Sequence, residues 1–319
     1  MNFVTVLLGE LSMKVISYIS TIPPKNKNQE KLDLLTNFAN GVSRTGDEGL
    51  IHRGFEPLPC DVAVIQGWQH ERGKTASHLA LRQQLIDRTR NKYVITADSN
   101  LFLYANATNK PHHYLRYSIN GIFPTTGNYC DDRIDTKRWD QISQHCNIRL
   151  SDTNNKGKYI VLCCQRDGGW SMGNSSVVEW VTNCITELRK YTDMKIIIRG
   201  HPGDKNAPRY LRNNVFSKYK DVVVSRWGIP LEQDLQKAWA VVNHNSSSVV
   251  GPIIMGYHAF ITDPQKSQCA EVANTDFSKI LSPTQFDREK WLQRISMFHW
   301  TFSELHDGSC WRHMRSYCQ

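Results

Sequence analysis

The sequence lacks any apolar stretch of about 18 residues, the minimum for a membrane-spanning helix. Its start, "MNFVTVLLGELS", is partly apolar, but no basic segment precedes the apolar run as in a secretory signal peptide. None of the nine cysteines has a CxxC or zinc-finger spacing, which argues against a redox motif or a structural zinc site. We therefore expect no membrane contact, and reduced cysteines in a cytoplasmic protein.

Several nucleotide and catalytic motifs are also missing. No GxGxxG follows a predicted strand, and no GxSxG is present, which argues against a dinucleotide-binding domain and a serine hydrolase. "DVAVIQGWQHERGKT" imitates a P-loop, but five residues separate Gly67 from Gly73 where the motif has four. His112, His113 and His201 lack a metal-ligand spacing. We expect neither a P-loop enzyme nor a protein-held metal site.

The clearest compositional feature is positive charge. Lysine and arginine number 39 against 30 acidic residues, which gives a net charge of +9 and a pI near 9.1. Such an excess indicates either a polyanionic partner or an ordinary solvated surface, and composition alone leaves both open.

Short apolar runs alternate with segments of helical pattern, which is typical of parallel α/β layers. The expected strands are 15–20, 61–66, 92–97, 159–164, 195–199, 222–225, 239–243 and 259–262. A polar stretch ending in "SDTNNKGK" separates two such series and predicts a linker. We predict a Rossmann-like domain over 1–155, a second over 156–285, and a helical tail over 286–319 that packs back on the first.

Polar residues gather at six predicted strand ends, and ligands of open parallel sheets bind outside such ends. The clusters are "GWQHERGK" (67–74), "DSN" (98–100), "QRDGGWS" (165–171), "GHPGDK" (200–205), "NHNSSS" (243–248) and "DPQKSQ" (263–268). Six of them point to a cleft between the two domains.

Two of these clusters favour a diphosphate site in the second domain. In 243–248, hydroxyl groups and free backbone N–H groups meet where a strand turns into a helix. In 165–171, Gly168–Gly169 permits close backbone approach, while Arg166 and Ser171 can donate hydrogen bonds. Serine and asparagine are equally preferred as plain helix caps, so a structural role stays open.

Asp98 is the carboxylate that the pattern singles out in the first domain. It ends a predicted strand, beside Ser99 and Asn100. A general base needs only hydrogen-bond reach to an acceptor hydroxyl. An Asx-type turn or a helix cap accounts for the same residues, and both roles stay open.

This layout resembles the GT-B glycosyltransferases, in which two Rossmann-like domains face a cleft and a C-terminal helix returns to the first. Within that group it is similar to the phage DNA glucosyltransferases, which modify hydroxymethylcytosine. "GKTASHLALRQQLIDRTRNKYVITAD" (73–98) resembles their Gly-Lys, long helix and strand ending in the catalytic aspartate. The donor-side arginine and the acidic ribose ligand of that family have no counterpart around "NSSSVVGPIIMGYHAF", which leaves the sugar and the nucleotide open.

The resemblance implies an inverting transfer from a nucleotide-sugar donor, UDP-sugar first, to 5-hydroxymethylcytosine in double-stranded DNA. It implies a monomer in the host cytoplasm, with Asp98 as base and Mg²⁺ as an optional accessory. The implied nucleotide-sugar-binding residues are Gln165, Arg166, Gly169, Ser171, Arg199, His201, Lys205, Asn245, Ser246, Ser247 and Ser248. The implied acceptor-binding residues are His70, Gly73, Lys74 and Asn100.

Two alternatives remain. "HPGDK" and "HNSSSVVGPIIMG" also resemble glycosyltransferases of capsular and envelope polysaccharide synthesis, and a non-catalytic DNA-binding protein is a different class again. Basic residues of the first domain would give affinity for DNA phosphates without sequence choice. They are Lys25, Lys27, Lys31, Arg72, Lys74, Arg82, Arg88, Arg90, Lys92 and Lys110. Trp68, Phe102 or Tyr104 could stack on a flipped base, although such side chains are more often core.

Overall fold

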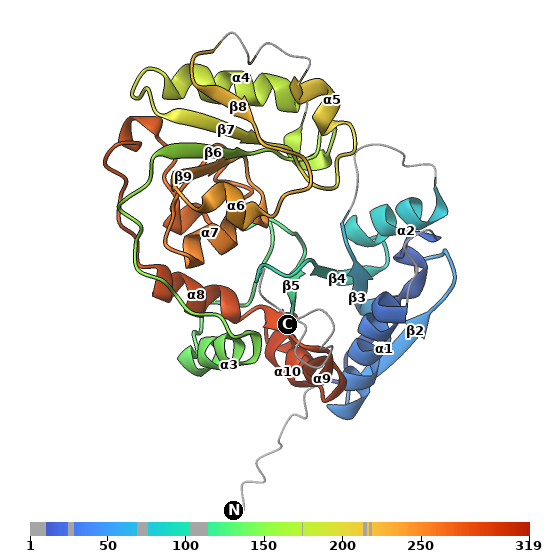
Figure 1. Ribbon diagram of the computed structural model, residues 1–319. Helices are drawn as coiled ribbons and strands as arrows, with labels where there is room; N and C mark the ends of the chain where they lie inside the picture. Colours follow the sequence, from blue (N-terminus) through green and yellow to red (C-terminus); the bar gives the residue numbers. More distant parts are fainter. Residues whose placement is uncertain are drawn as a thin grey trace, which may run out of the picture. The chain divides into compact units, whose positions relative to one another are not determined.

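The computed structural model describes residues 11–24, 29–68, 76–102, 114–173, 175–212, 216 and 219–319. They belong to two compact units, which are described separately (Figure 1). Unit 1 comprises Met1–Ser99, Ala107–Ile122 and Trp300–Gln319, and unit 2 comprises Asn100–Asn106 and Phe123–His299. Segment 123–155, expected with the first domain, thus lies in unit 2, and the expected tail divides between the units. Each unit is an α/β layer structure built on a largely parallel sheet, which confirms the predicted fold class.

The sheet of unit 1 has six strands in the order β11-β5-β4-β3-β1-β2. Their bounds are β1 Lys14–Tyr18, β2 Glu48–His52, β3 Cys60–Gln66, β4 Asn91–Asp98, β5 Leu115–Ile119 and β11 His299–Trp300. β2, β1, β3 and β4 are mutually parallel, whereas β5 runs antiparallel to β4. The sequence pattern indicated β1, β3 and β4 but neither β2 nor β5.

Helices cover this sheet through apolar contacts. α1 (Gln29–Arg44) packs against β1 and β2, and α2 (Ser77–Ile86) lies beside the short helix η1 (Ile19–Thr21). The α2 cluster comprises Ile16, Tyr18, Ala63, Ile65, Leu81, Leu85 and Val94, all buried. Full burial of such a side chain stabilises the fold by about 1.5–3 kcal/mol.

The last two helices, α9 (Phe302–His306) and α10 (Ser309–Arg315), pack against α1. Asp47, which precedes β2, fixes them: its Oδ2 accepts from Trp311 Nε1 and Arg315 Nε, both at 2.7 Å. Its Oδ1 accepts from the Met13 backbone N–H at 2.9 Å. Burial alone would raise the pKa of Asp47, but these hydrogen bonds outweigh it and lower the pKa below its usual value.

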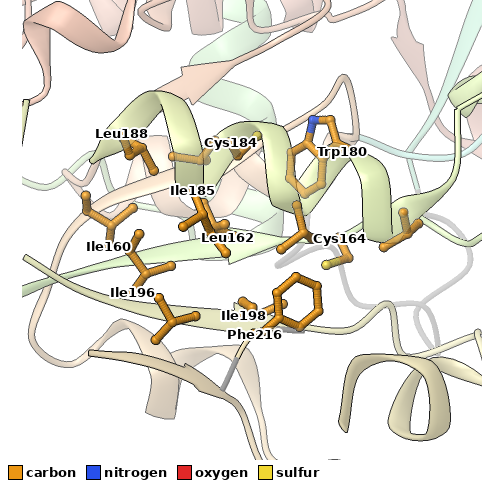
Figure 2. Close-up of a cluster of buried hydrophobic side chains, with 14 of the residues drawn as sticks. Ile160, Leu162, Cys164, Trp180, Cys184, Ile185, Leu188, Ile196, Ile198 and Phe216 are labelled. Atoms are coloured by element: carbon orange, nitrogen blue, oxygen red, sulfur yellow. The ribbon is translucent and has the colours of Figure 1, made fainter. Parts of the chain in front are cut away.

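Unit 2 contains a five-stranded, wholly parallel sheet in the order β10-β9-β6-β7-β8. Its strands are β6 Tyr159–Cys163, β7 Lys195–Arg199, β8 Val222–Val224, β9 Ala238–Asn243 and β10 His258–Ile261. Figure 2 shows α4 (Val177–Leu188) laying Trp180, Cys184, Ile185 and Leu188 on β6 and β7. The helix expected over 231–239 is the short α6 (Leu231–Leu235), because Trp239 already belongs to β9.

The remaining elements of unit 2 are short. They are α3 Thr136–Cys146, η4 Trp170–Met172, α5 Ala207–Arg212, η6 Ser247–Val249, α7 Val250–Ile254, η7 Ala270–Val272, η8 Phe277–Lys279 and α8 Arg288–Ser296. α3 packs on α8, and Arg138 of α3 donates to the carbonyl oxygen of His299. None of the helices in the described ranges is long and apolar enough to span a bilayer. All nine cysteines are free thiols.

Candidate functional site

The candidate site lies at the carboxyl edge of the unit 2 sheet. Because its five strands are parallel, the loops that follow them meet at one edge. These loops contain most of the polar clusters noted in the sequence, at 165–171, 200–205, 243–248 and 263–268. The structure therefore brings residues far apart in the sequence onto one edge.

A hydrogen-bond network of uncharged side chains joins the loops at 165–171 and 243–248, and the Asp263 carboxylate connects it to the loop at 263–268. The Asn245 carboxamide accepts from Gln165 Nε2, and its Nδ2 donates to the Ser171 carbonyl at 3.1 Å and to Asp263 Oδ2 at 3.0 Å. Ser171 Oγ donates to Gln165 Oε1 at 2.9 Å. Gln165 and Asn245 are buried, although 80 residues separate them in sequence. Three of the predicted donor residues, Gln165, Ser171 and Asn245, thus form one connected group.

The serine-rich turn follows β9. Ser246 Oγ accepts from the Ser248 backbone N–H at 3.2 Å, and Asn243 Nδ2 donates to the Ser246 carbonyl at 2.8 Å. Asn243 Oδ1 is buried without a hydrogen-bond partner in the described part of the chain. The turn opens only η6 and the five-residue α7, so the helix dipole expected here is weak. Anion binding at this turn depends on hydroxyl and N–H groups more than on the dipole.

The loop after β6 has the backbone conformation that its glycines permit. Gly168 has φ +65, and a Cβ on Gly169 would lie 2.9 Å from the Arg166 carbonyl oxygen. Asp167 Oδ1 accepts from the first N–H of α4, that of Val177, at 2.9 Å. The Arg166 side chain is exposed, as is Lys205 on the neighbouring loop. The side chains of Arg166 and Lys205 are therefore both accessible to a ligand that contacts the backbone of the glycine loop.

Asp204, which was not among the predicted site residues, links the loop after β7 to the loop after β6. Its carboxylate accepts from the Asp167 N–H at 3.0 Å, the Tyr210 hydroxyl at 2.8 Å and the Asn206 N–H at 3.0 Å. Burial acts to raise the pKa of Asp204, but these hydrogen bonds lower it below the usual value. Asp204 is the one carboxylate in the polar cluster "GHPGDK", which could have marked it as a candidate site residue. Its hydrogen-bond partners could not be read from the sequence.

His201, in the same loop, is half-buried, and its Nδ1 accepts from the Gly203 N–H at 3.0 Å. Burial lowers the pKa of His201, and the nearby Arg166 guanidinium adds to this, against the opposing effect of Asp204. At neutral pH the ring is uncharged, so it can exchange hydrogen bonds but supplies no positive charge.

A second group of missed residues lies after β9 and β10. The Thr262 hydroxyl accepts from Trp180 Nε1 at 2.8 Å and lies 2.7 Å from His244 Nδ1. His244 Nε2 is 3.8 Å from Asp263 Oδ2, which also accepts from Asn245. Burial lowers the pKa of His244, although Asp263 opposes the shift. Through Asp263, this group is hydrogen-bonded to Asn245.

A pocket of about 150 Å³ lies after β7 and β8 in unit 2. It is lined by Arg199, Gly200, Pro202, Ser225, Arg226, Trp227, Gly228 and Ile229. The Arg199 side chain in this lining is held in place by two hydrogen bonds. Its guanidinium donates to Asp234 at 2.7 Å and to the Ile229 carbonyl at 2.8 Å. Trp227 is 38% exposed, which leaves a ring surface open for stacking.

In unit 1, Asp98 ends β4 as expected. Its Oδ2 accepts from Arg116 of β5 at 2.6 Å, and its Oδ1 accepts from the Ser99 N–H at 2.7 Å. Asn100 Oδ1 accepts from the Phe102 N–H at 2.6 Å, an Asx-type turn. The other acceptor candidates, His70, Gly73 and Lys74, lie outside the described residues.

The residues proposed to contact DNA differ in how accessible they are. Arg82 is buried and donates at 2.8 Å to the carbonyls of Thr21 and Trp68, and Lys92 pairs with Asp61 at 2.8 Å. Phe102 is buried and stacked on Trp139 in the core of unit 2, so it cannot receive a flipped base. Arg88 and Arg90 are exposed, Lys31 is half-buried, and Trp68 packs partly buried against the α2 cluster. Lys25, Lys27, Arg72, Lys74, Tyr104 and Lys110 lie outside the described residues.

The part of the chain that the structure describes contains no set of side chains arranged to bind Mg²⁺. No group of three or more His, Cys, Asp or Glu is arranged there to hold a metal ion. The carboxylates of these loops, Asp167, Asp204 and Asp263, all accept hydrogen bonds from protein groups.

Comparison with protein-family models and with curated proteins finds no match. Among solved structures, the chain is similar to the "KpsC, beta Kdo 2,7 transferase" of Thermosulfurimonas dismutans, with a TM-score of 0.52 and 10% identity over 93% of this chain and 98% of that one. The "beta Kdo 2,4 transferase" of the same organism gives 0.46 and 12%, over 90% of each chain. A UDP-GlcNAc 2-epimerase of Methanocaldococcus jannaschii gives 0.32 and 11%, over 96% and 100%.

At such low identity the first of these likenesses shows the fold alone. The chain is a two-unit α/β protein of the GT-B type. The finer resemblance to phage DNA glucosyltransferases stays a sequence-based prediction.

Proposed function

We propose that the protein is a glycosyltransferase whose unit 2 holds a nucleotide-activated sugar. The observation that carries the proposal is the neutral network of Gln165, Ser171 and Asn245 at the carboxyl edge of a parallel sheet. It fixes a glycine loop and a serine-rich turn with two exposed cations nearby, Arg166 and Lys205. Preorganised N–H, hydroxyl and cationic groups are what a departing phosphate needs.

The donor would lie across these loops. Its phosphates would contact the Gly168–Gly169 backbone, the Ser246–Ser248 hydroxyl groups and Arg166. Its nucleoside would extend toward the pocket that contains Trp227. His201, with a lowered pKa, would act as a neutral hydrogen-bonding group toward the phosphate.

The reaction would be a direct displacement. The acceptor oxygen attacks the anomeric carbon, the bond from that carbon to the phosphate oxygen breaks, and a base takes the hydroxyl proton. Asp98 is the candidate base. Its ion pair with Arg116 fixes the orientation of the carboxylate and leaves lone pairs on both oxygens for an incoming hydroxyl.

A saccharide is the acceptor class we favour. The structure with the TM-score of 0.52 carries the name of a Kdo transferase, and the "HPGDK" and serine-rich segments resemble enzymes of envelope polysaccharide synthesis. Nucleotide-activated Kdo and UDP-sugars are therefore the first donors to test.

Hydroxymethylated DNA is the second candidate acceptor, and the net charge of +9 favours it. It predicts binding that weakens steeply with salt as counterions return to the phosphates. Flat affinity between low and moderate salt, or equal binding to a neutral glycan, would count against DNA.

A pair of asparagine variants tests the donor site. Asn245→Ala removes the hub of the network, whereas Asn274→Ala removes a buried asparagine of the same unit that bonds Ala259 and Thr284 instead. Calorimetric titration would use nucleoside mono- and diphosphates, UDP-sugars and nucleotide-activated Kdo. We expect Asn245→Ala to weaken binding at least tenfold, and Asn274→Ala to bind as the wild type does.

Turnover is read by mass spectrometry of saccharide primers and of hydroxymethylated DNA, each incubated with the same donors. Absence of binding by any nucleotide to the folded wild type would overturn the proposal. Equal loss in both variants would show that the network acts through stability alone.

A further inference from the structure

β2 forms one edge of the unit 1 sheet. The Glu48 N–H donates to the Met13 carbonyl at 2.9 Å, which turns the backbone groups of Glu48, Leu50 and His52 toward β1. The alternation of a strand therefore turns those of Gly49 and Ile51 outward. Ser43 Oγ reaches the Gly49 carbonyl at 3.3 Å, and no further strand of the described chain lies on this side.

The same edge is apolar. Leu50 is 37% exposed, Ile51 38% and Phe55 52%, which makes this the densest run of exposed large apolar side chains in the described ranges. The strand contains no proline and no lysine, the residues that commonly block an open edge. An edge of this kind is a template for another strand.

We propose that β2 pairs with β2 of a second copy, antiparallel about a two-fold axis through Leu50, so that the protein forms a dimer in place of the expected monomer. In this register Gly49 of each copy faces Ile51 of the other and exchanges the outward hydrogen bonds. Exposed Glu48 faces His52 of the other copy, whose Nε2 lies 3.3 Å from Glu56 of its own chain, so no like charges meet in this register. The two six-stranded sheets become one continuous sheet.

β8, one of the two edge strands of the unit 2 sheet, offers a comparison that favours β2 as the pairing strand. Val223 is 41% exposed, so β8 also has an apolar edge. The hydrogen bond from the Ser225 N–H to the Ile198 carbonyl turns Val223 inward, so a two-fold axis would again pass through the central residue. That register places Lys220 opposite Arg226 of the other copy, and like charges repel. The β8 register therefore brings like charges together, whereas the β2 register does not.

The interface is small, since one short strand and Phe55 supply it, whereas stable interfaces bury about 1,600 Å². We therefore expect a reversible dimer that dissociates on dilution. Sedimentation velocity over a concentration series should show the mass rising from 36.7 kDa toward twice that value.

Cross-linking tests the register. Residues facing each other at a non-hydrogen-bonded antiparallel pair have Cβ atoms about 4.5–5.5 Å apart, close to the span of a disulfide. With oxidised glutathione as oxidant, Leu50→Cys should give a covalent dimer on a non-reducing gel. Val223→Cys, the matched edge control, should stay monomeric, and circular dichroism confirms that both fold.

A charge variant gives a second test that requires no oxidation. Leu50→Lys places two like charges on the axis and should abolish the concentration-dependent rise in mass, while Val223→Lys should leave it intact. Equal cross-linking of both cysteine variants, or a wild type that is monomeric at every concentration, would overturn the proposal. Cross-linking of Leu50→Cys only after removal of residues 1–10 would also overturn it, because the occupant of the edge would then be that segment.

Discussion

The carboxyl edges of the two sheets are held by different chemistry. In unit 2, the carboxylates of Asp204 and Asp263 accept hydrogen bonds from amide N–H groups, and the cations Arg166 and Lys205 stay exposed. In unit 1, charged groups are bound to other protein groups: Asp98 to Arg116, and Arg82 to two carbonyls. Loops whose carboxylates bond to N–H groups leave nearby cations exposed, whereas the carboxylate of Asp98 is paired with a cation. This difference agrees with the proposed roles, an anionic donor in unit 2 and an oriented carboxylate, Asp98, in unit 1.

The largest expected effect concerns the charged anchor of unit 1. Asp47→Ala breaks the buried ion pair with Arg315 and removes the acceptor of Trp311 Nε1 and of the Met13 N–H, so we expect a loss of about 3 kcal/mol in the free energy of unfolding. Asp61→Ala is the matched control, because Asp61 also accepts a β1 N–H, that of Lys14, but pairs with the exposed Lys92. Denaturant titration should show a much smaller loss there; equal losses would remove the contrast between the anchors.

Asp98→Asn should lower turnover roughly a hundredfold or more, because an amide does not accept the hydroxyl proton. The amide oxygen can keep only one of the two hydrogen bonds that Asp98 accepts, from Ser99 or from Arg116, so unit 1 should lose a little stability. Donor binding in unit 2 should change little. Steady-state kinetics and calorimetry separate these effects. Near-normal turnover would make Asp98 a turn residue and would shift the search for the base to His201.

Acid should affect unit 2 first. Burial lowers the pKa of His201, His244 and His258, so the unfolded chain binds more protons than the folded one below about pH 6.5. The stability from these neutral rings is present above that pH and is lost as the pH falls through it. The lowered pKa values of Asp47 and Asp61 in unit 1 act only below about pH 3.9.

Melting temperatures at pH 7.5 and 5.5 measure this difference. We expect a fall in the wild type and a smaller fall in His258→Gln, which removes one of the three rings without touching the candidate site. A fall of the same size in that variant would show that His258 takes no part in the acid response.

The smallest effect is expected at the serine turn. Ser246→Ala removes the cap of η6, which should cost about 0.5–1 kcal/mol of stability. If the turn also binds phosphate, donor affinity should fall by more than this stability loss implies. Unchanged affinity would restrict Ser246 to capping.

The sequence revealed those elements whose own residues decide their structure. β7 was predicted at its observed bounds because "KIIIR" is a buried run between polar turns. β5 was missed because "LRYSI" is mixed in polarity and is a strand only through its pairing with β4. Likewise β2, "EGLIH", is exposed on most of its length and lacks the buried pattern.

The candidate site divides in the same way. The polar loops were recognisable because glycine, serine and asparagine follow apolar strands. The links that turn these loops into one site were not, because they join residues far apart in the chain, as Gln165 does with Asn245. Asp204 and Asp263 gain their importance only from such partners.

The division of the chain has a consequence for the order of events during synthesis. Unit 1 includes Trp300–Gln319, which is synthesised after all of unit 2. Unit 2 is nearly continuous, because Phe123–His299 supplies all of it except Asn100–Asn106. A ribosome delivers the chain from its N-terminus, and domains generally fold as their residues emerge. Unit 2 can complete its core while α9 and α10 are still in the exit tunnel, and until they emerge Asp47 lacks its bonds to Trp311 and Arg315. The first-synthesised part of unit 1 therefore stays open to aggregation and proteolysis until α9 and α10 reach it.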